Sequence, residues 1–313
     1  LKHPSFAGGC RCVGLMLSGL TEKKSSAGWI DVPICEAILT KDLSIVVAVD
    51  GSEASMTGLT YVTNLLMQQE RSLTAQVVHV YDDNKEYLPV HCRRDQLRGT
   101  VEAQLIGSVS QKRFRLVWIR KDGLPAGQHI CATISDTHAD YCCMGFFGLK
   151  GKKHNELEVT SNVFRVLCQG NSCSIICIKD NAPSLLPVGR PTIFVVSVSI
   201  NKSSTKAFLD ALRLSRPGDE IHVVYIKSYM EREDSDYTAE VRSKYTAFFS
   251  GLKDGEEQVF SKFHDRTTHF KLLSKQRRET TAESVVQYAD SVDADFVVVG
   301  ANAADRVSRG KNP

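Results

Sequence analysis

Polar and glycine residues at three places in the chain could together bind a phosphate-bearing ligand. Asp50 directly follows the apolar run Leu43–Val49, so its carboxylate could accept a hydrogen bond from an amino group or a hydroxyl. Gly145 and Gly148 lack a Cβ, which lets backbone N–H groups approach phosphate oxygens. Ser161 opens an expected helix, and the free N–H groups and positive dipole end of a helix N-terminus attract anions.

Short apolar runs rich in β-branched residues alternate with segments of helical spacing and must position these groups. In the first half of the chain we expect strands at Leu43–Val49, Ala75–Tyr81, about 114–119, about 141–145 and Ser174–Lys179. The alternation predicts a parallel sheet covered by helices on both faces, and the near-continuous apolar strands agree. Ligands in such sheets bind beyond the carboxyl ends of the strands, where Asp50 and Gly145 stand.

The same order of elements restarts after residues 181–191, a segment with proline and glycine that is typical of a linker. Strands are expected again at Thr192–Val198, Glu220–Ile226, His269–Leu273 and Ala294–Gly300. This repetition indicates an internal duplication. We therefore predict an α/β protein of two tandem doubly wound parallel-sheet domains, at 41–180 and 192–313. The second copy should lack the last helix and fifth strand, because the sequence ends at Pro313.

Residues 1–40 do not show this pattern, and we expect a disordered leader or a mistranslated segment there. Their short apolar stretch Leu15–Leu20 leaves a cut signal peptide as the alternative. Elsewhere no apolar run approaches the roughly 20 residues that span a bilayer, so no membrane partner is expected. The net charge of +3 gives no reason to expect a nucleic-acid partner.

The chain has ten cysteines, but their spacing is not that of a zinc site. Cys142 and Cys143 are adjacent, and adjacent strand residues point to opposite faces. Most of the others lie in apolar patterns and are expected to be small buried side chains. We therefore expect a reduced, cytoplasmic protein.

Three segments resemble the universal stress protein family, one of the adenine-nucleotide-binding α/β folds. They are Val46–Ser55 (VVAVDGSEAS), Met144–Gly148 (MGFFG) and Thr160–Ile178 (TSNVFRVLCQGNSCSIICI). The resemblance covers about 41–180 well and about 190–310 more weakly. It implies a site for ATP or another adenine nucleotide, with or without Mg²⁺. Carried over residue by residue, the binding residues are Val49, Asp50, Val80, Met144, Gly145, Gly148, Thr160 and Ser161.

Two departures from the family pattern bear on this site. Thr160 stands where the family has glycine, and the preceding spacer 149–159 is longer. That spacer carries Lys150, Lys152, Lys153 and His154, which could contact phosphate or simply form a solvated loop. In the second copy Ser199 replaces Asp50 and Ala303 replaces Gly148, so no nucleotide is expected there.

His79 and His222 appear at equivalent strand positions, and we interpret them as a repeated feature of the fold rather than a catalytic pair. Asp82 and Asp83 follow the second strand; a turn is favoured there over magnesium ligation.

The expected function is a nucleotide-binding protein with a regulatory or stress-response role and an ATP site in the first domain only. The alternative is a structural or interaction module of the same fold that binds no ligand. An adenine-nucleotide hydrolase ranks last, because no general base is evident. A homodimer through Ser174–Lys179 is also predicted, since this strand would form an apolar sheet edge without an internal partner.

Overall fold

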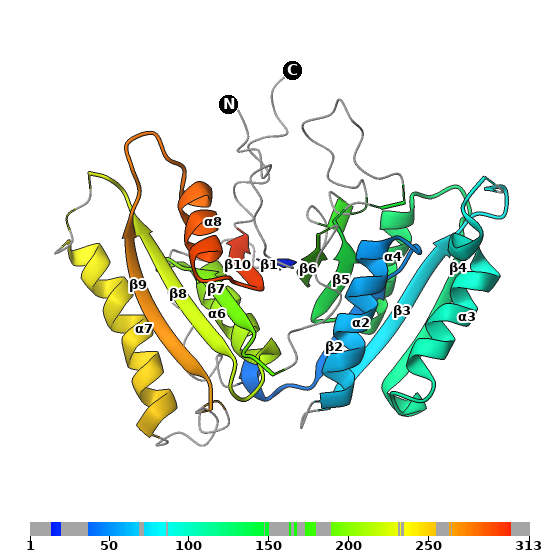
Figure 1. The fold of residues 1–313 in the computed structure, drawn as a ribbon, viewed down its shortest axis with the longest axis horizontal. Helices are drawn as coiled ribbons and strands as arrows, with labels where there is room; N and C mark the ends of the chain where they lie inside the picture. The colour runs from blue at the N-terminus through cyan, green and yellow to red at the C-terminus, as the bar shows by residue number, and fades with distance from the viewer. Residues whose placement is uncertain are drawn as a thin grey trace. The chain divides into compact units, whose positions relative to one another are not determined.

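A computed structural model describes residues 14–19, 37–68, 72–85, 87–146, 148–149, 163, 166–167, 173–179, 189–230, 232, 235–254, 263 and 265–301. The chain divides into two compact units (Figure 1). The first unit is Asp42–Leu186, and the second unit combines Leu1–Lys41 with Pro187–Pro313. Among the described residues, no helix is both long and apolar enough to cross a membrane.

The first unit is a five-stranded parallel sheet in the order β4-β3-β2-β5-β6. Its strands are β2 (Leu43–Ala48), β3 (Leu73–Tyr81), β4 (Phe114–Arg120), β5 (Tyr141–Gly145) and β6 (Ser174–Ile178). Its helices are α2 (Glu53–Gln68), α3 (Arg94–Leu105), α4 (Ala126–Thr137) and the short 3₁₀ turns η1 (Val90–Cys92) and η2 (Gln111–Arg113). The strand order reverses between β2 and β5, which is the kind of place where open α/β sheets bind ligands.

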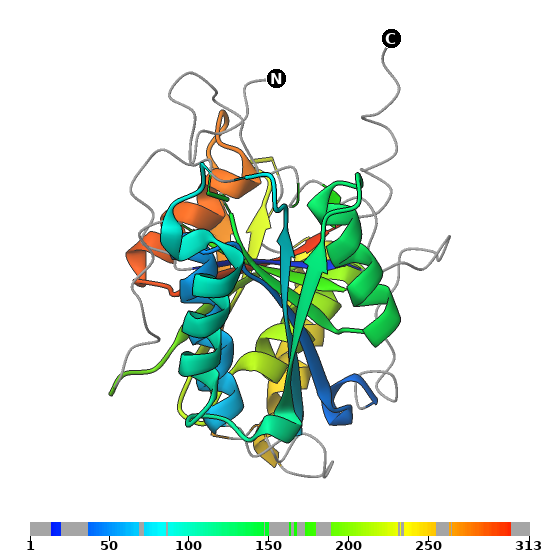
Figure 2. The ribbon, with the colours of Figure 1, turned by 90° about the vertical axis from the view of Figure 1, so that its right-hand side faces the viewer.

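Helices cover both faces of this sheet. The Cys143 thiol of β5 donates to the backbone oxygen of Gly58 in α2 at 3.7 Å. Helix α4 packs against β2 and β3, and Figure 2 shows it on the side of the sheet opposite α2. The predicted doubly wound α/β fold is confirmed.

The second unit repeats this arrangement, with the strand order β1-β10-β7-β8-β9 and all pairs parallel. Its strands are β1 (Gly14–Gly19), β7 (Ile193–Ser197), β8 (Glu220–Lys227), β9 (Thr267–Ser274) and β10 (Phe296–Ala301). Its helices are α6 (Lys202–Leu214), α7 (Asp236–Asp254) and α8 (Thr281–Ser291). The buried cluster of Val195, Val224, Val285 and Ala289 joins the sheet to α8.

Strand β1 corrects two predictions about the ends of the chain. It pairs with β10 from Gly14↔Phe296 to Gly19↔Ala301, as β6 pairs with β5 in the first unit. The second unit therefore has a fifth strand, and residues 14–19 are not a disordered leader. Sequence order concealed this, because backbone hydrogen bonds let any suitably extended segment complete a parallel sheet.

Each unit has an equivalent hydrogen bond at the start of its central strand. Asp140, just before β5, accepts from the backbone N–H of Ser44 through Oδ2 at 3.1 Å. Asp295, just before β10, accepts from the N–H of Ile193 through Oδ2 at 2.9 Å. Arg190 adds a bidentate ion pair to Asp295 in the second unit, at 2.8 and 3.0 Å. The shared contact is what an internal duplication predicts.

Candidate functional site

The carboxyl ends of β2, β3 and β5 lie side by side at one edge of the first unit's sheet. β2 lies between the other two, and all three strands are parallel. This edge carries five of the residues predicted from the sequence, namely Val49, Asp50, Val80, Met144 and Gly145. Val49 and Met144 are buried, whereas Asp50 and Val80 are partly exposed.

Both carboxylate oxygens of Asp50 accept hydrogen bonds from the loops around them. Oδ1 accepts from the backbone N–H of Ser52 at 3.0 Å and from its hydroxyl at 2.6 Å. Oδ2 accepts from the backbone N–H of Leu149 at 3.0 Å. Asp50 therefore joins the turn after β2 to the loop after β5. A carboxylate offers about four lone-pair sites, so these three bonds leave limited capacity for a ligand.

Gly148 lies directly against this carboxylate. A Cβ added to Gly148 would lie 3.0 Å from Oδ2 of Asp50. A side chain at this position would displace the carboxylate or the loop, so glycine allows the close approach. Thr160 and Ser161, together with residues 150–154, lie outside the described residues.

The turn after β2 requires glycine at position 51 for two reasons. Gly51 has a φ of +86°, which side-chain-bearing residues rarely adopt, and a Cβ there would lie 2.9 Å from the Cys92 Sγ. The buried Cys92, in η1, donates its S–H to the Gly51 oxygen at 3.6 Å. Sequence reasoning missed Cys92 in this role, because η1 is a short turn with no periodic signal.

His79 of β3 contacts the backbone at the end of β2, beside Asp50. Its Nδ1 lies 2.8 Å from the backbone oxygen of Val49, and its ring packs edge-on against Trp118. Burial lowers the pKa of His79, partly offset by the hydrogen bond to Val49 and by Asp50. The neutral imidazole therefore donates from Nδ1 to the carbonyl. This contact is structural, as the sequence indicated.

The acidic pair after β3 forms a turn. Asp82 Oδ1 accepts from the backbone N–H of Asn84 at 3.2 Å. Asp83 pairs with the Arg120 guanidinium at 3.0 Å. Each carboxylate thus has a local partner, as the turn interpretation predicts.

The corresponding edge of the second unit carries hydroxyl groups in place of a carboxylate. The Ser199 hydroxyl lies 2.9 Å from that of Ser204. Asn201 caps α6 by accepting from the Ser204 N–H at 2.8 Å. Gly300, at the end of β10, lies so close to α6 that a Cβ would meet the Ser203 carbonyl carbon at 2.5 Å. Neutral groups and a closely packed helix occupy this edge.

His79 and His222 do not occupy equivalent positions, which corrects the interpretation made from the sequence. Val46 of β2 pairs with Gln76 of β3, and Val195 of β7 pairs with His222 of β8. Val46 stands four residues before Asp50, and Val195 stands four residues before Ser199, which takes the place of Asp50. Gln76 is therefore the counterpart of His222. Matching letters between two apolar strands does not fix their register, and an odd-numbered shift moves a side chain to the other face.

A further side-chain cluster lies within the second unit. Glu220, His222 and His269 place their carboxylate and ring nitrogen atoms within 4.8 Å of one another. An open surface depression of about 680 Å³ lies over the β9–α8 turn, lined by Gln276, Arg277, Arg278, Glu279, Glu283 and Gln287. Neither feature involves the edge that carries Asp50.

Solved structures show what this architecture resembles. A universal stress protein from Archaeoglobus fulgidus gives a TM-score of 0.53 at 13% identity, over 81% of this chain and 85% of that chain. A putative universal stress protein from Pseudomonas aeruginosa gives 0.44 at 11% identity, over 87% and 97%. A universal stress protein in complex with cAMP gives 0.33 at 12% identity, over 44% and 96%. No protein-family model and no curated protein matches the sequence. The likeness to the Archaeoglobus fulgidus protein, with its TM-score above 0.5, shows that the chain has the universal-stress-protein fold.

Proposed function

We propose that the first unit binds ATP or another adenine nucleotide, and that the protein is a universal-stress-protein-like regulator that responds to that ligand. The observation that carries the proposal is the contact between Asp50 and Gly148 beyond the carboxyl ends of β2 and β5. It puts an acceptor and a side-chain-free backbone at the point where the strand order reverses. The regulatory role rests on the family resemblance alone.

In the proposed site, apolar side chains would contact the adenine ring, and polar groups would bind the hydrogen-bonding parts of the ligand. Val80, partly exposed at the end of β3, would contact the adenine ring, next to the buried Val49 and Met144. The Asp50 carboxylate would accept from the adenine amino group or a ribose hydroxyl. Backbone N–H groups around Gly145 and Gly148 would donate to phosphate oxygens. Thr160 and Ser161 complete the proposal on sequence grounds only.

A module that binds no ligand is the second candidate, and one observation favours it. Three hydrogen bonds from Ser52 and Leu149 already engage the Asp50 carboxylate. A nucleotide must use the remaining acceptor capacity or displace the N–H of Leu149.

In the second unit the matching edge has no carboxylate at position 199, so we assign nucleotide binding to the first unit only.

Equilibrium titration of the full chain with a fluorescent ATP analogue, in buffer containing Mg²⁺, tests the proposal. Asp50→Ala removes the acceptor, and Gly148→Val places atoms against the carboxylate. Each should weaken binding at least about tenfold, roughly 1.4 kcal/mol. Ser199→Ala, the matched change in the second unit, should leave the affinity unchanged. Absence of binding at millimolar ATP would favour the ligand-free module, and unchanged affinity in both variants would place the site elsewhere.

The homodimer through Ser174–Lys179 remains a proposal with a weaker basis. It assumed that the second copy has no fifth strand, but β1 fills that place in the second unit. Ile176 is fully buried, so Ile176→Lys would test folding rather than pairing. Sedimentation equilibrium of the unmodified chain is the better measurement, and a mass near 35 kDa would argue against the dimer.

A further inference from the structure

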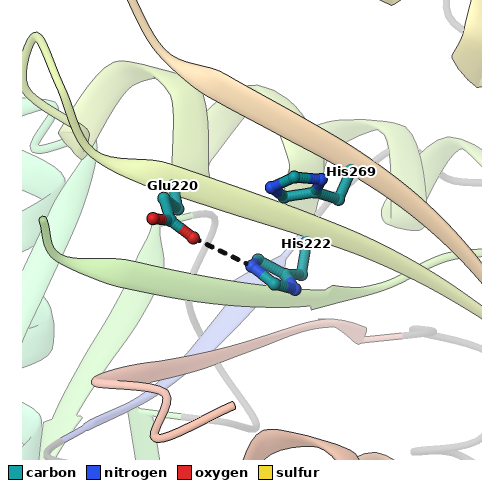
Figure 3. Close-up of side chains that lie close together, drawn as sticks. All are labelled: Glu220, His222 and His269. Atoms are coloured by element: carbon teal, nitrogen blue, oxygen red, sulfur yellow. Dashed lines mark hydrogen bonds and ion pairs between the residues drawn. The ribbon is translucent and has the colours of Figure 1, made fainter.

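Three potential metal ligands converge on one face of the second unit's sheet, independently of the proposed nucleotide site. Glu220 and His222 are two residues apart in β8, and so point to the same face. His269 in β9 is the direct cross-strand partner of His222. Figure 3 shows the three side chains close together, with the Glu220 carboxylate directed toward the His222 ring. Their ligand atoms lie within 4.8 Å of one another.

The spacing of these atoms is close to that of a metal site. His222 Nε2 and Glu220 Oε2 are 3.3 Å apart. Two ligands bound at about 2.0–2.1 Å in tetrahedral geometry are separated by about 3.3 Å, so this pair needs little movement. The His269 ring centroid lies 4.8 Å from that of His222. His269 is the more exposed histidine, so a rotation about its side-chain bonds could bring a ring nitrogen closer.

Tyr288 of α8 supports the central histidine. Its hydroxyl lies 2.8 Å from His222 Nδ1, while Nε2 faces the carboxylate. Metal-binding histidines commonly hydrogen-bond an oxygen through the second ring nitrogen, which fixes the ring and the tautomer. With Nδ1 donating its proton to the Tyr288 oxygen, the lone pair of Nε2 would be free for an ion. His222 is 8% exposed, so its contacts with Tyr288 and Glu220 lie in a largely buried place.

We propose that Glu220, His222 and His269 bind one divalent transition-metal ion, with Zn²⁺ the best match. Two imidazoles with one carboxylate are a common ligand set for Zn²⁺, whereas Ca²⁺ and Mg²⁺ prefer oxygen ligands. Three protein ligands leave a fourth position for water. The ion would join β8 to β9 and, through Tyr288, to α8, and so would stabilise the second unit.

The first unit provides an internal comparison, because its equivalent positions cannot bind a metal in this way. By strand register, His222 corresponds to Gln76, whose cross-strand partner is Arg115. Glu220 corresponds to Thr74 by the same register. A guanidinium at the position of His269 would repel a cation. The cluster therefore belongs to the second unit and does not follow from the repeated fold.

Lys271 is the charge that opposes binding. It lies two residues from His269 in β9, on the same face. A nearby ammonium raises the electrostatic cost of placing a second cation there. Lys271→Gln should therefore tighten metal binding.

Co²⁺ titration of the full chain under reducing conditions, followed by competition with Zn²⁺, tests the proposal. Cobalt bound by nitrogen and oxygen gives weak visible bands, whereas thiolate ligands add intense near-ultraviolet absorption. This separates the cluster from the ten cysteines. The variants are His269→Ala, Glu220→Gln and Tyr288→Phe. The matched control, His138→Asn, removes an exposed histidine of the first unit from a left-handed conformation that asparagine tolerates.

The parent and His138→Asn should bind one Co²⁺ without thiolate absorption and release it to Zn²⁺. His269→Ala and Glu220→Gln should each lose at least about tenfold in affinity, and Tyr288→Phe about tenfold, the scale of an outer-shell partner. Zn²⁺ should also raise the melting temperature of the parent but not of His269→Ala. The proposal is overturned if the parent binds no metal with these bands, or if both ligand variants bind like the parent.

Discussion

At the scale of single residues, Asp50 has a proposed role and an observed one. We propose it as a ligand acceptor from its position after β2, and the structure shows its carboxylate bonded to Ser52 and Leu149. The Ser52 contact is local and typical of an aspartate that opens a turn. The Leu149 contact joins residues 99 positions apart, so it depends on the packing of β2 beside β5. Local chemistry was predictable here, but the loop that shares the carboxylate was not.

Gly51→Ala tests the fit of the turn after β2. Alanine must adopt a φ of +86° and places Cβ 2.9 Å from Cys92 Sγ, so we expect a loss of about 2–3 kcal/mol in unfolding free energy. Gly123→Ala is the matched control. Gly123 also has a positive φ, +96°, but has nothing within 4 Å, so only about 1 kcal/mol should be lost.

Urea unfolding, with Trp118 fluorescence as the signal, measures the unfolding free energy of both glycine variants. The measurement uses a Trp29→Phe background, because the chain has two tryptophans. Equal losses in the two glycine variants would show that Cys92 does not constrain the turn.

His79 should make the stability of the first unit depend on pH. Its pKa is lowered from the ordinary value of 6.5, chiefly by burial, so the unfolded chain binds the proton more readily than the folded one. Stability should therefore be greatest above pH 6.5 and fall as the pH drops from about 7 to about 5. His79→Gln keeps a side-chain N–H donor but does not titrate, so its stability should depend less on pH.

Urea midpoints of Trp118 fluorescence at several pH values provide the measurement, with His138→Asn as the control that should behave like the parent. A His79→Gln variant whose pH dependence matches the parent would show that burial of His79 has no such effect.

At the scale of elements, the sequence predicted strands well where apolar runs are long and β-branched. The run Leu43–Val49 matches β2 closely, and Glu220–Ile226 matches β8. The sequence did not predict β1. Gly14–Gly19 is short and begins and ends with glycine, and it pairs with β10, which lies far from it in the sequence. Sequence reasoning also misjudged register, since His79 was matched to His222, whereas the strand pairing makes Gln76 the counterpart of His222. These errors concern contacts between distant segments, which periodicity does not report.

Removal of β1 tests its place in the second unit. Deletion of residues 1–20 should expose the edge of β10 and speed hydrogen exchange of the β10 amides, because the parallel partner is lost. Deletion of residues 1–10, which leaves β1 whole, should not. The comparison uses exchange mass spectrometry on peptides that cover Phe296–Ala301. Equal protection of β10 in the two truncated chains would contradict the pairing.

At the scale of the whole molecule, two units of one fold carry different chemistry at different places. The first unit has a carboxylate and a glycine in contact beyond its central strands, where the second has Ser199 and a helix packed against Gly300. The second unit has Glu220, His222 and His269, where the first has threonine, glutamine and arginine. We infer that a nucleotide and a metal ion would act on separate units. Their dissociation constants should therefore be measurable independently.

The central claim is that an adenine nucleotide binds at the carboxyl edge of the first unit. The most direct measurement is a two-dimensional amide spectrum of the isotope-labelled full chain during titration with Mg²⁺ and ATP. We expect chemical-shift changes that saturate together for Asp50, Gly145, Gly148 and Leu149, with no comparable changes at Ser199 and Gly300. Saturating changes confined to the second unit, or none at millimolar ATP, would contradict the account.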